Sequence, residues 1–193
     1  MTASFTLHST ESAPDSSRSL LDKVSKSRGS VPNILKIMAA SPATLEAYLT
    51  LSALFGAKVQ FSPIEAHVVM QTINRANDCK YYMAAHSKMA VGKQGVPAEI
   101  DRELCSGKPL SNRRLEALRA FTYAMTIKRG WIHKSHLDSF FAAGFTSTSA
   151  LEVILAIGLK TISNYTNHIA ATPAEERFTS QLDELGMMPA AAE

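Results

Sequence analysis

Apolar residues recur at helical spacing along most of the chain. The clearest run lies between residues 151 and 169, where apolar side chains are three or four positions apart, at Leu151, Ile154, Leu155, Leu159, Ile162, Tyr165 and Ile169. This spacing is typical of a long helix with its apolar stripe buried. The periodicity predicts helices over residues 16–27, 33–40, 42–55, 63–77, 79–91, 97–106, 112–129, 134–143, 147–169 and 173–183. No segment is convincing as a strand, so the sequence predicts an all-α fold.

Capping residues mark the starts of two of these helices. Ser41 precedes Pro42 and Ser62 precedes Pro63, so each serine can cap a helix whose first residue is proline. Glu65 follows Ser62 at the spacing of a capping box. Glycines then fall where the apolar period breaks, for example at Gly56, Gly107, Gly130 and Gly144.

The pattern predicts one domain. Residues 1–14 are rich in serine and threonine and lack periodic apolar spacing, so we expect a flexible N-terminal arm. Residues 15–185 should form a single helical domain, followed by a C-terminal tail over 186–193. No linker rich in proline or glycine divides the chain, and no internal repeat is visible.

Composition places the chain among ordinary globular proteins. It has 46% hydrophobic and 19% charged residues, with a formal net charge of +3. Its lysines and arginines are scattered, which gives no reason to expect a nucleic-acid partner. Nothing resembles a signal peptide, and Lys160 and Asn164 interrupt the most hydrophobic segment, so we expect no membrane span and a cytoplasmic protein.

The two cysteines, Cys79 and Cys105, are too few for a disulfide framework in a chain of this size, so each is expected to be a thiol. Asp78 is a plausible N-cap, which would place Cys79 in the first turn of a helix. There the helix dipole and free N–H groups favour an anion, so this position predicts a lowered thiol pKa. Cys105 has no motif around it and is interpreted as structural.

Tyr82 and His86 follow Cys79 at spacings of three and seven, so the three side chains share one helix face. A thiol beside an imidazole suits a Cys-His nucleophile, or a thiolate that reduces a peroxide while the histidine handles the proton. No cluster has metal-ligand spacing and no glycine-rich phosphate loop occurs, so neither a metal nor another cofactor is expected. Asn164, Asn167 and His168 are interpreted as a network between helix ends or subunits.

The segment from Pro63 to His86 resembles the motif of alkylhydroperoxidase D-like and carboxymuconolactone decarboxylase-like proteins, in which an acidic residue precedes Asn-x-Cys-x-x-Cys-x-x-x-His. Residues 31–35 and 159–169 look like flanking signatures of the peroxidase-related branch, and the similarity extends over roughly residues 28 to 178. The resemblance implies an alkylhydroperoxidase D-like helical bundle that assembles as a homo-oligomer, as a dimer, trimer or hexamer.

In that family, as the resemblance implies, two cysteines three apart reduce the substrate, a histidine and an acid relay protons, and an external reductant resets the pair. Cys79 and His86 match the first cysteine and the histidine. Tyr82 stands at the second cysteine, and His67 stands at the acidic position twelve residues before Cys79. Glu65 is close in sequence but points from a different side of its helix, which makes it a poor substitute for the acid.

Three functions remain open from the sequence. The favoured one is a peroxidase-like oxidoreductase that reduces small hydroperoxides through Cys79, whose sulfenic acid is reset by an external thiol or by Cys105. The second is non-redox proton transfer on a small organic acid or lactone, with His67 or His86 as base. The third is an inactive helical oligomer or binding module. Cys79, His86 and His67 are the candidate catalytic residues, and Tyr82 and Glu65 are expected in the substrate pocket.

Overall fold

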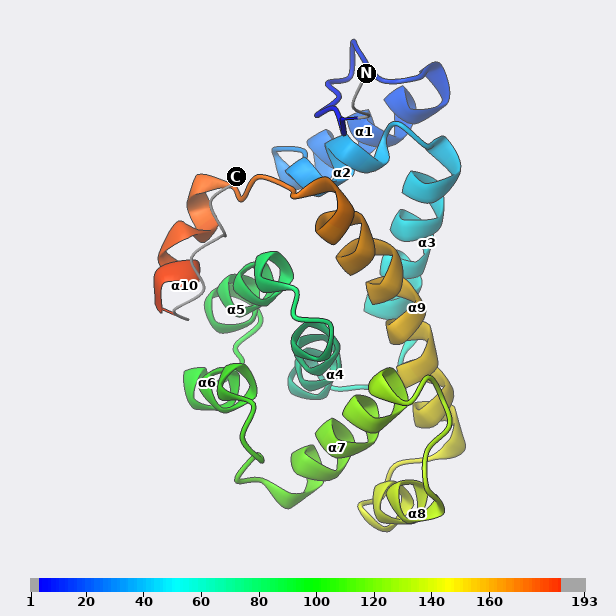
Figure 1. Ribbon diagram of the computed structural model, residues 1–193, viewed down its shortest axis with the longest axis vertical. Helices are drawn as coiled ribbons and strands as arrows, with labels where there is room; N and C mark the ends of the chain where they lie inside the picture. Colours follow the sequence, from blue (N-terminus) through cyan, green and yellow to red (C-terminus); the bar gives the residue numbers. More distant parts are fainter. Residues whose placement is uncertain (1–3, 185–193) are drawn as a thin grey trace.

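The computed structural model describes residues 4–184, and this part of the chain forms one domain of helices and connecting loops, without strands (Figure 1). The α-helices are α1 (Asp15–Arg28), α2 (Asn33–Met38), α3 (Pro42–Lys58), α4 (Pro63–Ala76), α5 (Lys80–Lys93), α6 (Ala98–Ser106), α7 (Arg113–Ile127), α8 (Lys134–Ala142), α9 (Ser147–Ala170) and α10 (Thr179–Glu184). A short 3₁₀ helix, η1 (Glu176–Phe178), precedes α10. The predicted all-α fold is therefore confirmed.

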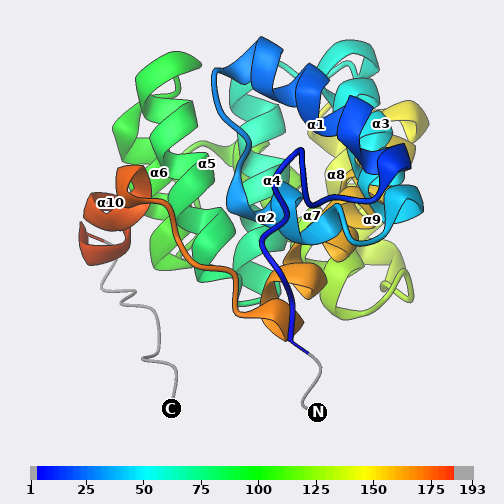
Figure 2. The same ribbon diagram turned by 90° about the horizontal axis from the view of Figure 1, so that it is seen from above.

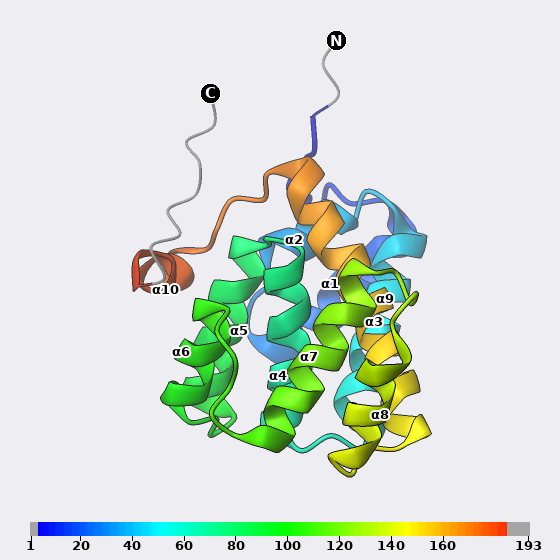
Figure 3. The same ribbon diagram turned by 60° about the horizontal axis from the view of Figure 1, so that its bottom comes forward.

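Helix α4 lies at the centre of the domain. It packs against α7, α5, α9 and α6, and Figure 3 shows α4 and α7 side by side with α3 and α9 behind them. One apolar cluster, around Val68, Phe121 and Phe140, joins α4, α7, α8 and α9. A second cluster, which includes Leu35 and Cys79, joins the N-terminal helices to α5 and the C-terminal segment. Cys79 therefore lies in the interior, within this second cluster.

The predicted helix starts at residues 42 and 63 are confirmed. The Ser41 hydroxyl accepts a hydrogen bond from the Thr44 N–H, and Ser62 forms a capping box with Glu65. The prediction of a single helix over residues 173–183 was wrong. Glu175 is extended because its carboxylate accepts hydrogen bonds from the Asn33 N–H and the Tyr81 hydroxyl, so helical structure begins only at η1.

The structure describes the N-terminal segment from residue 4 but not the C-terminal residues 185–193. Residues 4–14 run alongside the N-terminal helices, where the His8 N–H donates to the Lys36 carbonyl oxygen and Ala13 is buried (Figure 2). The flexibility expected for the arm over 1–14 stays a prediction. The expected tail over 186–193 lies outside the described residues.

Helix α9 buries only part of the apolar stripe that the sequence suggested. Leu159 of that stripe is buried, but Leu151 and Ile169, at its two ends, are 66% and 69% exposed, and Ile154 and Tyr165 are exposed as well. Val153 and several polar residues outside the stripe are buried. The helix carries apolar side chains on more than one face, so spacing alone could not decide which face meets the core. The expected homo-oligomer stays a prediction.

Within residues 4–184, no single helix is long and apolar enough to cross a membrane. The pair α8 and α9 passes on length and composition only when taken together, and the two helices are bent by 118° at the break between them.

Candidate active site around Cys79

The chain turns sharply between α4 and α5, and this turn sets the position of Cys79. Asp78 adopts a left-handed backbone conformation with φ of +50°, and the Cys79 N–H donates to the Asn74 carbonyl oxygen at 2.8 Å. Helix α5 then begins at Lys80, so Cys79 is itself the N-cap residue. The prediction that Asp78 caps the helix was wrong, because Asp78 is used to reverse the chain direction.

The Cys79 side chain is fully buried, with 0% exposure. Burial raises the pKa of its thiol, although the Tyr82 backbone N–H, the Lys160 charge and nearby asparagine amides each act to lower it. The sequence predicted a lowered thiol pKa from the helix N-terminus alone. That contribution exists in the Tyr82 N–H, but the loss of hydration outweighs it.

Two asparagine side chains of α9, Asn164 and Asn167, lie near the Cys79 thiol. Asn167 Nδ2 donates to Cys79 Sγ at 3.5 Å, and the buried Asn167 Oδ1 has no hydrogen-bond partner. Asn164 accepts from Asn77 Nδ2 at 2.9 Å and donates to Asn74 Oδ1 at 3.2 Å. These contacts join α9 to the α4–α5 turn, as expected of a network between helices. His168 lies outside this network and is exposed, beside the Tyr165 ring.

Lys160 completes the group around Cys79. Its side chain is buried in α9, with Nζ 3.2 Å from His86 Nε2 and 3.5 Å from the centre of the Tyr82 ring. Burial lowers the pKa of Lys160 to about 7. The sequence analysis treated Lys160 only as an interruption of an apolar segment. A lysine one turn before Asn164, on an otherwise apolar helix, was the signal that could have identified it.

The structure brings the side chains of Cys79, Tyr82, His86 and Lys160 together. We call these four residues and Asn167 the thiol cluster. Burial lowers the pKa of His86 well below its usual value, and the charges of Lys160 and His67 act in the same direction. The imidazole is therefore neutral near pH 7. Tyr82 packs its ring in the cluster and donates its hydroxyl to Tyr48 at 3.3 Å, while burial raises its pKa well above the usual value.

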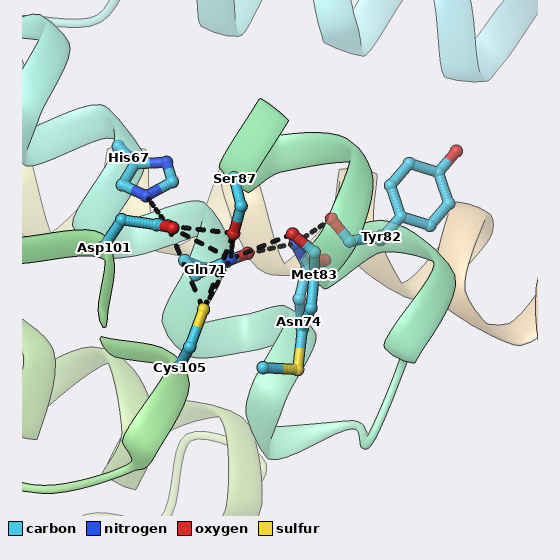
Figure 4. A network of polar contacts seen from close by, with 8 residues as sticks. All are labelled: His67, Gln71, Asn74, Tyr82, Met83, Ser87, Asp101 and Cys105. Atoms are coloured by element: carbon cyan, nitrogen blue, oxygen red, sulfur yellow. Dashed lines mark hydrogen bonds and ion pairs between the residues drawn. The ribbon is translucent and has the colours of Figure 1, made fainter. Parts of the chain in front are cut away.

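His67 belongs to a second group, the α4–α5–α6 network shown in Figure 4. His67 Nε2 donates to Asp101 Oδ1 at 2.8 Å, and the Ser87 hydroxyl donates to the same oxygen at 3.0 Å. Gln71 Nε2 donates to Ser87 Oγ at 2.9 Å and lies 3.4 Å from Cys105 Sγ. A carboxylate from α6 is therefore paired with the histidine that stands at the expected acidic position.

Asp101 was missed because it lies on another helix, 34 positions from its histidine partner. Its neighbour Cys105 is held in the same network, where burial and the Asp101 charge raise the pKa of the Cys105 thiol. The Tyr82 side chain points away from this network, which it joins only through its backbone carbonyl, bonded to Asn74 Nδ2 at 3.3 Å (Figure 4). The two cysteines therefore lie in different polar environments.

Glu65 does not lie with the thiol cluster. Its carboxylate accepts from the Ser62 N–H at 2.9 Å in the capping box of α4 and pairs with Arg114 at 3.0 Å. These bonds hold the N-terminus of α4 against α7. The expectation that Glu65 lines a substrate pocket with Cys79 was therefore wrong, because helix capping already uses this side chain.

Two other features limit the possible site chemistry. Across residues 4–184, no group of three or more histidine, cysteine, aspartate and glutamate side chains is arranged to hold a metal ion. A surface groove of about 580 Å³ lies along α7 and the start of α8, lined partly by Tyr123, Trp131 and His136. The thiol cluster does not contribute to its lining.

Comparison with known proteins identifies the fold. No family model matches the sequence, and no curated protein matches it. Among solved structures, an uncharacterised peroxidase-related protein with an alkylhydroperoxidase AhpD core, from Ralstonia eutropha JMP134, superposes with a TM-score of 0.78 at 18% identity, over 96% of each chain.

An uncharacterised peroxidase-related protein from Silicibacter sp. TM1040 gives a TM-score of 0.74 at 18% identity, covering 91% of this chain and 92% of that one. A cysteine-to-alanine variant of the debrominase Bmp8, in complex with 2,3,4-tribromopyrrole, gives 0.77 at 19% identity, covering 96% and 98%. The chain therefore has the alkylhydroperoxidase D-like helical fold.

Proposed function

We propose that this protein is a single-cysteine, peroxidase-like oxidoreductase that reduces small hydroperoxides through Cys79. One observation carries the proposal: the thiol shares a buried cluster with an imidazole, an amine and an amide donor, contributed by His86, Lys160 and Asn167. Such a cluster can ionise a thiol and deliver a proton in a place with little water. Peroxidase-related proteins among the structural neighbours agree with this chemistry.

The oxidation step consumes only the thiol and the hydroperoxide. The Cys79 thiolate attacks the terminal oxygen of the hydroperoxide, the S–O bond forms as the O–O bond breaks, and the leaving oxygen takes a proton to become an alcohol or water. Sulfur loses two electrons and becomes sulfenic acid. The Asn167 side-chain N–H donates to Cys79 Sγ, so this hydrogen bond stabilises the negative charge of the thiolate.

The oxidised cysteine is reset from outside the chain. Tyr82 stands where a resolving cysteine would lie, and Cys105 is held in the α4–α5–α6 network by Gln71 and Ser87. An external thiol therefore displaces water from the sulfenic acid and forms a mixed disulfide, and a second thiol releases Cys79. Two external thiols are oxidised to a disulfide in each cycle.

The substrate reaches Cys79 from the side of His86 and Asn167, which are both partly exposed, whereas the sulfur itself is covered. Access to the covered thiol would require these two side chains to move, which would favour compact hydroperoxides over bulky ones. The unpaired Asn167 Oδ1 is placed to accept a hydrogen bond from the hydroperoxide O–H.

The test is peroxide consumption by the full chain with a small thiol as reductant. Hydrogen peroxide and tert-butyl hydroperoxide serve as substrates, and mass spectrometry of the peptide containing Cys79 follows the gain of one oxygen atom. We expect Cys79→Ser to abolish consumption and Cys105→Ser to retain it. Consumption that survives in Cys79→Ser, or a Cys79 that peroxide does not oxidise faster than the denatured chain, contradicts the proposal.

A second candidate follows from the debrominase neighbour, whose structure was determined with 2,3,4-tribromopyrrole bound. Removal of bromine from such a ring also suits a buried cysteine with proton donors nearby. The same variants decide this case when 2,3,4-tribromopyrrole replaces the peroxide and bromide release is measured. Bromide release that depends on Cys79, without peroxide consumption, favours this candidate over the first.

A further inference from the structure

We propose that Lys160 takes the proton of the Cys79 thiol and returns it to the leaving oxygen of the substrate, while His86 holds the amine in place. This inference rests on the proposed function, because it describes how the same cysteine reacts. It assigns a proton-transfer residue on α9, far in sequence from the motif on α5 that contains the cysteine and the histidine.

The Lys160 side chain is placed to exchange a proton within the thiol cluster. The lysine enters the thiol cluster from α9, and its side chain is 2% exposed. Nζ lies 3.2 Å from His86 Nε2 and 3.5 Å from the Tyr82 ring centre. Tyr82 follows Cys79, the N-cap residue of α5, by one turn. Asn167, two turns after Lys160 on α9, donates to Cys79 Sγ at 3.5 Å. Contacts from both helices therefore place the amine in the same cluster as the thiol, and its charge acts on that thiol.

The relative basicity of the two nitrogen groups decides which one receives the proton. Burial and neighbouring charge lower the pKa of His86 well below its usual value, whereas the pKa of Lys160 is lowered to about 7. The amine is therefore the stronger base in the cluster. His86 Nε2 accepts a hydrogen bond from Lys160 and fixes the direction of Nζ, which makes His86 a positioning residue.

The remaining groups around Lys160 are mostly neutral. Tyr82 on α5 is hydrogen-bonded to Tyr48 on α3, and burial raises the pKa of both hydroxyls. His67 on α4 acts on His86, and its own partner is Asp101 on α6, a carboxylate already bonded to Ser87. The Cys79 thiol, whose pKa burial raises, is thus the acid that acts on Lys160 in this cluster.

Burial disfavours the charged form of both groups, so it shifts the thiol and the amine towards their neutral forms. Proton transfer makes a thiolate and an ammonium together, and these opposite charges stabilise each other in a site of low dielectric. The face of the Tyr82 ring adds a cation–π contact that acts only on the ammonium form. The reactive state therefore forms without a net change in charge.

The step is balanced. The thiol proton moves to the Lys160 amine, the sulfur attacks the terminal oxygen of the hydroperoxide, and the O–O bond breaks. The Lys160 ammonium then gives its proton to the departing alkoxide, so that the products are Cys79 sulfenic acid and an alcohol, and Lys160 is again a neutral amine. The sulfur supplies two electrons and the peroxide accepts them.

The test compares two reactions of Cys79 that differ in their need for an acid. Alkylation by iodoacetamide releases iodide, which needs no proton, whereas tert-butyl hydroperoxide releases an alkoxide, which does. Lys160→Arg keeps a positive charge that does not give up a proton. We therefore expect this variant to lose peroxide reactivity by about a hundredfold while alkylation stays close to wild type.

Lys160→Met removes both charge and base, so both rates should fall at pH 7 and alkylation should recover as the pH is raised. Lys88→Met, an exposed change on α5, is the matched control. Circular dichroism of each variant establishes that it is folded. Lys160 variants with wild-type peroxide rates overturn this inference, provided that wild-type Cys79 reacts. A wild-type Cys79 that does not react with peroxide instead overturns the proposed function.

Discussion

Replacement of Lys160 by methionine should stabilise the protein, by an amount that depends on pH. In the folded chain burial lowers the pKa of Lys160 from 10.5 to about 7. At ~1.4 kcal/mol for each pKa unit, this shift corresponds to a cost of ~5 kcal/mol at pH 7. Methionine has a similar unbranched stem and no charge to desolvate, so Lys160→Met removes this cost.

The sign follows from proton binding. Between pH 7 and 10.5 the unfolded lysine is protonated and the folded one is not, so the free energy of unfolding of the wild type rises with pH in this window. The methionine variant lacks this contribution. Its advantage is therefore greatest below pH 7, and it shrinks by ~2 kcal/mol between pH 7 and pH 9.

Urea denaturation at pH 7, 8 and 9, followed by circular dichroism in the presence of a reductant, measures the difference. Lys88→Met, at an exposed site, is expected to show no such pH dependence. Equal stability differences for Lys160→Met at all three pH values would show that the folded lysine keeps its ordinary pKa. That result would refute the neutral amine on which its role as a base depends.

Three further changes test the framework around the cluster by urea denaturation. Asp101→Ala should destabilise the chain by ~3 kcal/mol, because it leaves His67 without its buried carboxylate; a loss below ~1 kcal/mol would argue against a tight pair. Gly107→Ala should cost ~1 kcal/mol or more, since φ is +74° and a Cβ would meet the Arg75 side chain. An unchanged midpoint of denaturation would contradict this. Ser62→Ala should cost ~1 kcal/mol through the lost cap of α4, and a neutral result would mean that water replaces the hydroxyl.

Local features of the sequence predicted the helices well, whereas burial could not be predicted from them. The Ser62 cap and the glycine at position 107 act within a few residues, so the sequence contains their whole physical cause. The pKa of the Cys79 thiol has a different origin. It depends on how many groups from α9 cover the sulfur, and these lie more than 80 positions away. A helix N-terminus therefore predicted the wrong direction.

The same limit explains the two residues that sequence reasoning missed. Lys160 and Asp101 each lie on a helix outside the motif, and each is brought to its histidine by packing of α9 or α6 against the α4–α5 pair. The structure buries both side chains, Asp101 to 7% exposure and Lys160 to 2%, which is rare for charged residues unless they are paired. Periodicity did not assign either position to a buried face.

Tyr82 stands at the second cysteine position of the motif that the sequence resembles, and it packs against the buried Lys160. The tyrosine ring lies against Lys160 Nζ, and its hydroxyl is bonded to Tyr48, so this side chain fills the space between α5, α3 and α9. A cysteine at position 82 has neither a ring face nor the length to reach Tyr48. The side chain at the position of the second cysteine in the family motif is thus the one that packs against the Lys160 amine. In the mechanism proposed above, reset by an external thiol and proton transfer by Lys160 would therefore both depend on this one position in the sequence.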